Sequence, residues 1–352
     1  MSERNFSQVA YMPYAPVEES FRIGNYEIWP YYKESSKRIK NKDVIQHLNR
    51  HFGRYFERKY DREKGGYDKP LEEIFVISPP NFELGISKFS EEQIEEIRTV
   101  SHVIAFCAIN ECSFVSSSAD AFILYVQNFQ VGSNGIALWN KYFTKLDMVK
   151  FMKPYYLDTS LLKFKKTDLC DALGKALQFK YKGQIKRIFR TAELFYHTAT
   201  HGEMVTDEHR LLSLVMCFEV LLNFENKIEF VEKIENLLNN AEPKMETRTV
   251  KIKNKDINVT KSKTSWWAFD LYNLRSDVVH GNEINWDIQK YGNIWTRIQF
   301  GGILLRKLIK KILSQESLWQ PDPIDSIIEA GTGALDETLE NMVAEFIKKY
   351  GI

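Results

Sequence analysis

The segment LYNLRSDVVHG, residues 271–281, sets an arginine and a histidine in an arrangement that could perform chemistry. Arg275 and His280 have R-x4-H spacing, and Gly281 follows directly. A guanidinium can hold a phosphate through two parallel hydrogen bonds and stays charged at any working pH. An imidazole, with an unperturbed pKa of about 6.5, takes or gives a proton near neutrality. Such a pair can cut RNA without a metal, because the ribose 2′-hydroxyl attacks the neighbouring phosphate and the enzyme need only move protons and stabilise charge.

Spacing alone does not establish such a site, because a chain with seven histidines produces accidental matches. Arg190 and His197 form a second, looser match on one face of a helical pattern, where a surface pair explains them equally well. Arg275 and His280 have a structural interpretation too: a helix-end arginine in a salt bridge, and a histidine favoured by the helix dipole near the C-terminus. Both interpretations stay open at this point.

The five-residue offset also constrains the geometry. On a regular helix it corresponds to about 140° of rotation, so Arg275 and His280 cannot easily lean over one phosphate. If two copies of the helix pack antiparallel across a two-fold axis, each arginine approaches the histidine region of its partner. A catalytic motif therefore predicts a homodimer.

The stretch RSDVVHG, within LYNLRSDVVHGN, and the preceding DEHRLLSLVMCFEVLLNF (207–224) resemble the C-terminal half of HEPN domains, in particular the Apea-like HEPN group. The resemblance covers residues 184–313. It implies a small α-helical bundle that dimerises with its R-x(4–6)-H motif at the dimer cleft. Many members of this family are metal-independent ribonucleases of toxin–antitoxin, abortive-infection and other anti-phage systems.

Carried over to this chain, the resemblance assigns Arg275 to the scissile phosphate and His280 to general acid–base catalysis. The family usually has Asn, Asp or His directly after the arginine, whereas this chain has Ser276. A serine hydroxyl can still donate a hydrogen bond to phosphate, and Asp277 could partly substitute. A non-cleaving module, used for dimerisation or nucleotide binding, is the alternative that this departure favours.

Other polar and aromatic residues near the motif have two interpretations each. Glu219 lies in an apolar helical pattern and needs a partner if buried, so it either orients Arg275 or His280 or satisfies another buried group. Asn273 could hydrogen-bond RNA, and Tyr272 could stack a base or belong to the core. Of the adjacent Trp266 and Trp267, one could stack a flipped base, although packing explains both.

A basic segment, AEPKMETRTVKIKNKDINVTKSKTS (241–265), precedes the motif helix. It holds seven Lys or Arg against three acids, with little helical periodicity. It is either a solvated loop or short hairpin, or a flap that attracts phosphate. In the second case the RNA-binding residues are Lys251, Lys253, Lys255, Lys261 and Lys263, together with Asn273.

The elements that must position these residues divide the chain into an α+β part and a helical part. Strand-like runs are predicted at 21–29, 73–78, 121–129 and 135–143, with helices over 41–59 and 91–108. From residue 167 onward the apolar spacing predicts helices with buried stripes over 185–195, 211–222 and 228–238, then helices over 265–280, 286–314 and 335–350. We therefore expect an α+β domain at 1–165, a HEPN-like bundle at 166–320 and a helical extension at 321–352.

The composition of the 352 residues excludes several classes of protein. A net charge of +1 excludes a globally basic nucleic-acid binder, so any RNA contact must be a local patch. The four cysteines show no CxxC pairing, which indicates buried thiols in a reducing compartment. No signal peptide is evident in residues 1–20 and the sequence has no run of 18 apolar residues that would span a membrane, so a cytoplasmic protein is expected.

No cofactor and no metal are expected. His47 and His51 have the spacing of a zinc-binding pair, but neither a following glutamate nor a third ligand is evident. The expected function is a metal-independent endoribonuclease acting as a dimer on RNA, in anti-phage abortive infection. The N-terminal domain would sense a phage-derived trigger, hold substrate or, with a cognate partner protein, restrain the active cleft.

Overall fold

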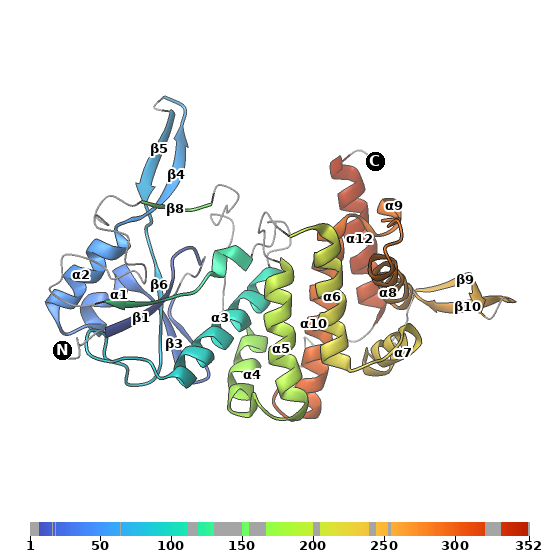
Figure 1. Ribbon diagram of the computed structural model, residues 1–352, viewed down its shortest axis with the longest axis horizontal. Coiled ribbons are helices and arrows are strands. Elements are labelled where there is room, and N and C mark those ends of the chain that lie inside the picture. The colour runs from blue at the N-terminus through green and yellow to red at the C-terminus, as the bar shows by residue number, and fades with distance from the viewer. Residues whose placement is uncertain are drawn as a thin grey trace. The chain divides into compact units, whose positions relative to one another are not determined.

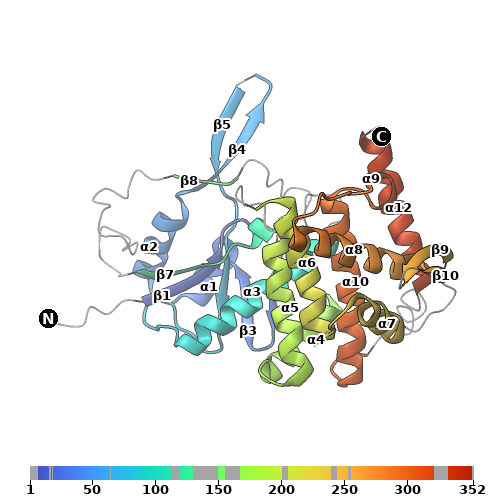
Figure 2. The same ribbon diagram turned by 45° about the vertical axis from the view of Figure 1, so that its right-hand side comes forward.

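The chain has the predicted α+β organisation, with a strand-rich N-terminal part and a helical C-terminal part (Figures 1 and 2). A computed structural model describes residues 7–15, 17, 19–63, 65–111, 119–129, 150–154, 167–199, 205–238, 244–252, 255–320 and 332–350. The chain divides into two compact units, Met1–Gln178 and Phe179–Ile352. Helix α4 (Asp168–Ala176), which was expected in the bundle, packs on β2 and α3 of the first unit.

The strand-rich unit is built around a five-stranded antiparallel sheet with the order β2-β3-β6-β1-β7. The interior strand β1 is buried almost throughout, and Ala10 pairs with Ile77 of β6 on one side and with Val126 of β7 on the other. A second sheet has the order β5-β4-β8. The strands and helices of this unit, besides α4, are β1 (Ser7–Met12), β2 (Phe21–Ile23), β3 (Tyr26–Pro30), α1 (Tyr31–Arg38), α2 (Lys42–Phe52), β4 (Tyr55–Asp61), β5 (Gly65–Pro70), β6 (Phe75–Ser78), α3 (Glu91–Glu111), the 3-10 turn η1 (Ala119–Phe122), β7 (Tyr125–Phe129) and β8 (Phe151–Met152).

Three predicted elements of this unit differ in the structure. The strand expected at 121–129 begins at Tyr125, after the 3-10 turn η1. The helix expected over 41–59 ends at Phe52, and Tyr55 begins the hairpin strand β4 instead of extending the apolar helical stripe. The run 21–29 is two strands, because Gly24, with a φ of +57°, turns the chain back between β2 and β3. The strand expected at 135–143 lies outside the described residues.

The helical unit consists of long helices that match the predicted stripes, plus one hairpin. The long helix expected from residue 286 begins at Ile294, where the Asn293 side chain accepts a hydrogen bond from the Thr296 amide. The elements are α5 (Gly183–Ala199), α6 (Asp207–Leu222), α7 (Lys227–Leu238), β9 (Met245–Ile252), β10 (Lys255–Ser262), α8 (Lys263–His280), α9 (Ile288–Tyr291), α10 (Ile294–Gln315) and α12 (Thr332–Tyr350), and the 3-10 turn η3 (Leu177–Phe179) lies at the boundary between the units.

Helix α8 is the element that organises this unit. It packs against α6, α7 and α12 and runs crosswise to α6 and α10, as Figure 2 shows. Its Trp267 is fully buried and meets Phe218 of α6 and Phe300 of α10 edge-on, with ring centroids 6.1 and 4.9 Å away. Such aromatic pairs add to the area that they bury. The core of the bundle therefore fixes the N-terminal half of the helix that carries Arg275 and His280. No described helix is long and apolar enough to cross a membrane.

Candidate active site at the C-terminal half of helix α8

The ends of α8 are fixed by local sequence. At the start, the Ser262 hydroxyl accepts a hydrogen bond from the Ser265 amide at 3.1 Å. At the end, Gly281 adopts a φ of +69°, which a glycine tolerates without strain, and the Asn282 amide donates to the Asp277 carbonyl at 2.9 Å. The helix thus stops at His280, as the sequence predicts, and the R-x4-H motif occupies its last two turns.

Arg275 is paired with Glu219 of α6. The two side chains are 3.6 Å apart at Nη2 and Oε1, and they are 32% and 28% exposed. The guanidinium also lies over the ring of Tyr272, 5.6 Å from its centroid. A guanidinium has five N–H donors, so this one contact orients it and leaves donors for a phosphate. Of the two partners considered for Glu219 within the motif, the structure brings it to Arg275.

His280, the last residue of α8, is exposed. Within the described residues of one chain, no hydrogen bond or ion pair joins it to Arg275 or to Glu219. The two motif residues are about 7.5 Å apart along the helix axis and about 140° apart around it. Ser276 lies half-buried next to Arg275. One chain therefore presents the two groups on different sides of the helix end.

A second polar contact lies on the α7 side of α8. The Lys227 ammonium donates a hydrogen bond to Asn273 Oδ1 at 3.1 Å and lies 4.4 Å from the centroid of the Phe269 ring. Lys227 is absent from the predicted site, and the sequence offered little signal for it, because it stands at the margin of a helical stripe. Tyr272 packs at 6.1 Å from the ring of Phe224, which supports its assignment to the packed surface between α7 and α8.

The basic segment before α8 forms the short hairpin, β9–β10, that was one of the two expected structures. It projects from the helices of its own unit in Figure 1. Thr247 pairs with Thr260 at 2.7 Å and Thr249 with Asn258 at 2.8 Å between exposed oxygens, which gives the ribbon one polar face. The opposite face carries the half-buried Arg248. The segment is an ordered ribbon attached to the bundle.

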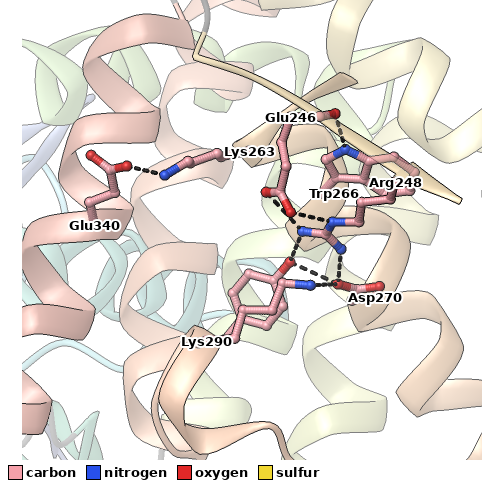
Figure 3. Close-up of polar contacts among 8 residues, drawn as sticks. Glu246, Arg248, Lys263, Trp266, Asp270, Lys290 and Glu340 are labelled. Atoms are coloured by element: carbon pink, nitrogen blue, oxygen red, sulfur yellow. Dashed lines mark hydrogen bonds and ion pairs between the residues drawn. The ribbon is translucent and has the colours of Figure 1, made fainter. Parts of the chain in front are cut away.

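Arg248 anchors this ribbon, as Figure 3 shows. Its guanidinium donates to Glu246 at 2.7 Å, to Asp270 of α8 at 2.6 Å and to the Tyr291 hydroxyl at 3.0 Å, and it lies 4.5 Å from the centroid of the Trp266 ring. Burial alone would lower the pKa of Arg248, but these hydrogen bonds outweigh it and the pKa is raised. The sequence did not indicate this role, because Asp270 and Tyr291 are remote along the chain.

Two of the five lysines proposed to bind RNA are paired with carboxylates. Lys261 pairs with Glu235 at 3.3 Å, and Lys263 pairs with Glu340 of α12. A phosphate would have to displace these carboxylates. Lys251 and Lys255 begin or end the described strands but their side chains are not described, and Lys253 lies outside the described residues. Phosphate binding by Lys251, Lys253 and Lys255 therefore stays a prediction.

Both tryptophans at the start of α8 are core residues. Trp266 and Trp267 are 1% and 0% exposed, so neither ring is free to stack on a flipped base. Trp266 donates from its indole nitrogen to the Glu246 carbonyl at 2.8 Å. The packing interpretation holds for both.

The described residues contain no group of three side chains suited to a metal ion. His51 is buried, and its Nε2 lies 2.8 Å from the Tyr11 hydroxyl. Burial, aided by the charge of Arg54, lowers the pKa of His51 to about 3, so the ring is neutral in the folded protein. Cys107, Cys170 and Cys217 are buried thiols, as expected, and Cys112 lies outside the described residues.

In the described part of the strand-rich unit, a pocket with a volume of about 440 Å³ lies beside β2, β3 and the loop after β6. Arg22 and Arg38 both bind the Glu27 carboxylate, and Arg38 also binds Glu34. Each guanidinium in the pocket wall is therefore already neutralised by a carboxylate. This charge balance gives the pocket no preference for a phosphate.

Comparison of the chain with family models, with curated proteins and with solved structures gives no match. A function for the site must be argued from its own geometry.

Proposed function

We propose that the helical unit is a metal-independent endoribonuclease of the HEPN type that acts as a homodimer. The observation that carries the proposal is the arrangement at the end of α8: Arg275 oriented by Glu219, and His280 exposed on the same two turns. A half-exposed guanidinium can bind the scissile phosphate, and an exposed imidazole can reach a proton on the ribose or on the leaving oxygen.

In the proposed reaction, the ribose 2′-oxygen attacks the adjacent phosphorus while a base removes its proton. The bond to the 5′-oxygen breaks, and that oxygen receives a proton. The products are a 2′,3′-cyclic phosphate and a 5′-hydroxyl end. His280 performs one of the two proton transfers, and Arg275 stabilises the extra negative charge on the phosphate oxygens.

In this proposal, dimerisation through the surface around Arg275 and Glu219 brings together the arginine and the histidine, which one chain presents on different sides of α8. Two exposed apolar side chains flank the ion pair: Met216, one turn before Glu219, is 45% exposed, and Val279, one turn after Arg275, is 53% exposed. Apolar side chains beside a polar site suit contact with a second copy of the chain. Such contact would bring the Arg275 of one chain toward the His280 of its partner.

An unregulated ribonuclease would harm its own cell. We assign to the strand-rich unit the sensing of a phage-derived trigger or the restraint of the cleft, and we place the protein in anti-phage abortive infection. This part of the proposal rests on the resemblance to the Apea-like HEPN group and on the cost of uncontrolled cleavage.

The test is cleavage of total RNA by the purified chain in EDTA. His280→Ala should reduce the rate by about a hundredfold or more, because it removes a general acid or base. The matched control is His197→Ala, which removes the histidine of the second spacing match; Arg190 in that match is paired with Glu193 at 2.6 Å. Cleavage that requires a metal, or that persists in His280→Ala, would refute the proposal.

One observation favours a second function, a non-cleaving module for dimerisation or nucleotide binding. Arg275 and His280 make no contact with each other in the described chain, and Ser276 stands where the family usually has Asn, Asp or His. In that case the wild-type protein leaves RNA intact in the presence of its trigger while still forming a dimer. Toxicity on expression of the wild type but not of His280→Ala would exclude it.

A further inference from the structure

Lys227, the first residue of α7, differs in its contacts from three other lysines of the helical unit. Lys233, Lys261 and Lys263 each lie against a carboxylate, from Glu229, Glu235 and Glu340 respectively. Among the described residues, Lys227 contacts the amide oxygen of Asn273 and the aromatic face of Phe269, which are both neutral.

This difference matters for binding an anion. A phosphate that approaches a paired lysine must replace a carboxylate, so little net attraction is gained. A lysine held by Asn273 and Phe269 keeps its full positive charge for the incoming ligand. The ammonium has three donors, and one hydrogen bond to Asn273 leaves capacity for phosphate oxygens. The contacts also hold the long side chain in place, which reduces the entropy that binding would cost.

The position of Lys227 relates it to the proposed site. Asn273 and His280 are seven residues apart on α8, so they lie on nearly the same face and about 10 Å apart along the axis. Ser276 lies between them on that face. A strand that lies along this face can therefore contact both positions. Arg275 lies on the side of α8 that faces α6.

The geometry points to a phosphate-binding subsite formed by Lys227 and Asn273, which holds the RNA strand on the α7 side of His280. The strand then runs along one face of α8, with one phosphate at Lys227 and the cleaved phosphate at the helix end. The inference rests on the proposed function, since it concerns the same RNA substrate. It makes Lys227 a substrate-binding residue that the motif does not reveal.

The experiment measures RNA binding separately from cleavage. The full-length chain carrying His280→Ala is titrated into a fluorescein-labelled single-stranded RNA over a series of salt concentrations. In this background, Lys227→Met keeps the aliphatic stem over Phe269 but removes the charge. We expect weaker binding and a salt dependence reduced by about 0.7 in the slope of log K against log salt, the amount for one lost phosphate contact with a single strand. Lys227→Arg should retain the slope.

Two further variants make the result specific. Asn273→Asp preserves the side-chain size and places a carboxylate against the Lys227 ammonium, so it should reduce the slope by a similar amount. Lys348→Met removes one exposed charge from α12 and should leave the slope unchanged. A merely structural role for Lys227 would lower the melting temperature without altering the slope.

The outcomes separate the two proposals. If the His280→Ala protein binds RNA, and both Lys227→Met and Asn273→Asp keep its slope, the subsite is refuted while the nuclease proposal stands. If the His280→Ala protein binds no RNA at any salt concentration, both proposals fail.

Discussion

The anchoring of the β9–β10 hairpin by Arg248 leads to a quantitative prediction for Arg248→Ala. The substitution removes hydrogen bonds to Glu246, Asp270 and Tyr291 and the stacking on Trp266. The side chain is 17% exposed, so these contacts are largely shielded from water. The hairpin would lose its strongest polar attachment to α8 and α9.

The size of the effect follows from what remains after the substitution. Breaking a fully buried ion pair costs about 3–5 kcal/mol, because it leaves an uncompensated charge. Asp270 is not left alone, since Lys290 lies 3.2 Å away and the Tyr291 hydroxyl donates to it at 2.8 Å. The loss of the cation–π contact adds about 1 kcal/mol. We therefore expect a free energy of unfolding lower by about 2–3 kcal/mol, which corresponds to a fall in melting temperature of roughly 5–10 °C.

Thermal unfolding of the full chain measures the shift, and amide hydrogen exchange locates it in β9, β10 and α8. The matched control is Arg190→Ala, which removes an exposed arginine whose partner Glu193 lies three residues away on α5. Exposed pairs of this kind contribute less than about 0.5 kcal/mol. The reasoning is refuted if both substitutions lower the melting temperature equally, or if the hairpin keeps its protection from exchange in Arg248→Ala.

Two further predictions concern stability. Burial lowers the pKa of His51 to about 3. Below about pH 6.5 the unfolded chain therefore takes up a proton on this histidine that the folded chain does not. The free energy of unfolding then falls by up to about 1.4 kcal/mol for each pH unit below that value. His51→Gln should remove this contribution and flatten the pH dependence of the melting temperature; equal slopes would contradict the assignment. Gly174→Ala should destabilise the strand-rich unit by about 2–3 kcal/mol in urea unfolding, because its Cβ would lie 2.5 Å from the backbone nitrogen of Gly24. Gly301→Ala is the comparison, since the atoms nearest to its Cβ belong to the Leu214 side chain and not to the backbone, and a loss as large as that of Gly174→Ala would show that the nature of the contact does not matter.

Local sequence predicted the elements whose signals lie close together in the chain. The helix predicted over 91–108 has a local start signal, Ser90, whose hydroxyl accepts a hydrogen bond from the Gln93 amide as the capping pattern requires. The end of α8 was found because Gly281 can adopt a positive φ. The error at 41–59 has a local cause: Tyr55 continues the apolar spacing of α2, although its side chain is buried from a strand.

The parts of the site that the sequence did not predict depend on partners remote in the chain. Arg248 reaches Asp270 and Tyr291, which are 22 and 43 residues away. Lys263 meets Glu340 at a separation of 77 residues. A run of basic residues looks the same in a sequence whether its charges face solvent or acids of another helix. Only the packing of α8 against α12 and the hairpin distinguishes the two.

The two ends of helix α8 differ in how tightly they are packed. Its first turns are held on all sides, since the fully buried Asp336 of α12 accepts hydrogen bonds from both the amide and the hydroxyl of Thr264. Its last turns carry side chains that solvent reaches. Under the proposed function, a substitution near His280 is expected to change activity and leave the fold intact, whereas a substitution near Thr264 is expected to destabilise the fold. Substitutions at the two ends of α8 should therefore be distinguishable, because those at the last turns should reduce activity and those at the first turns should reduce stability.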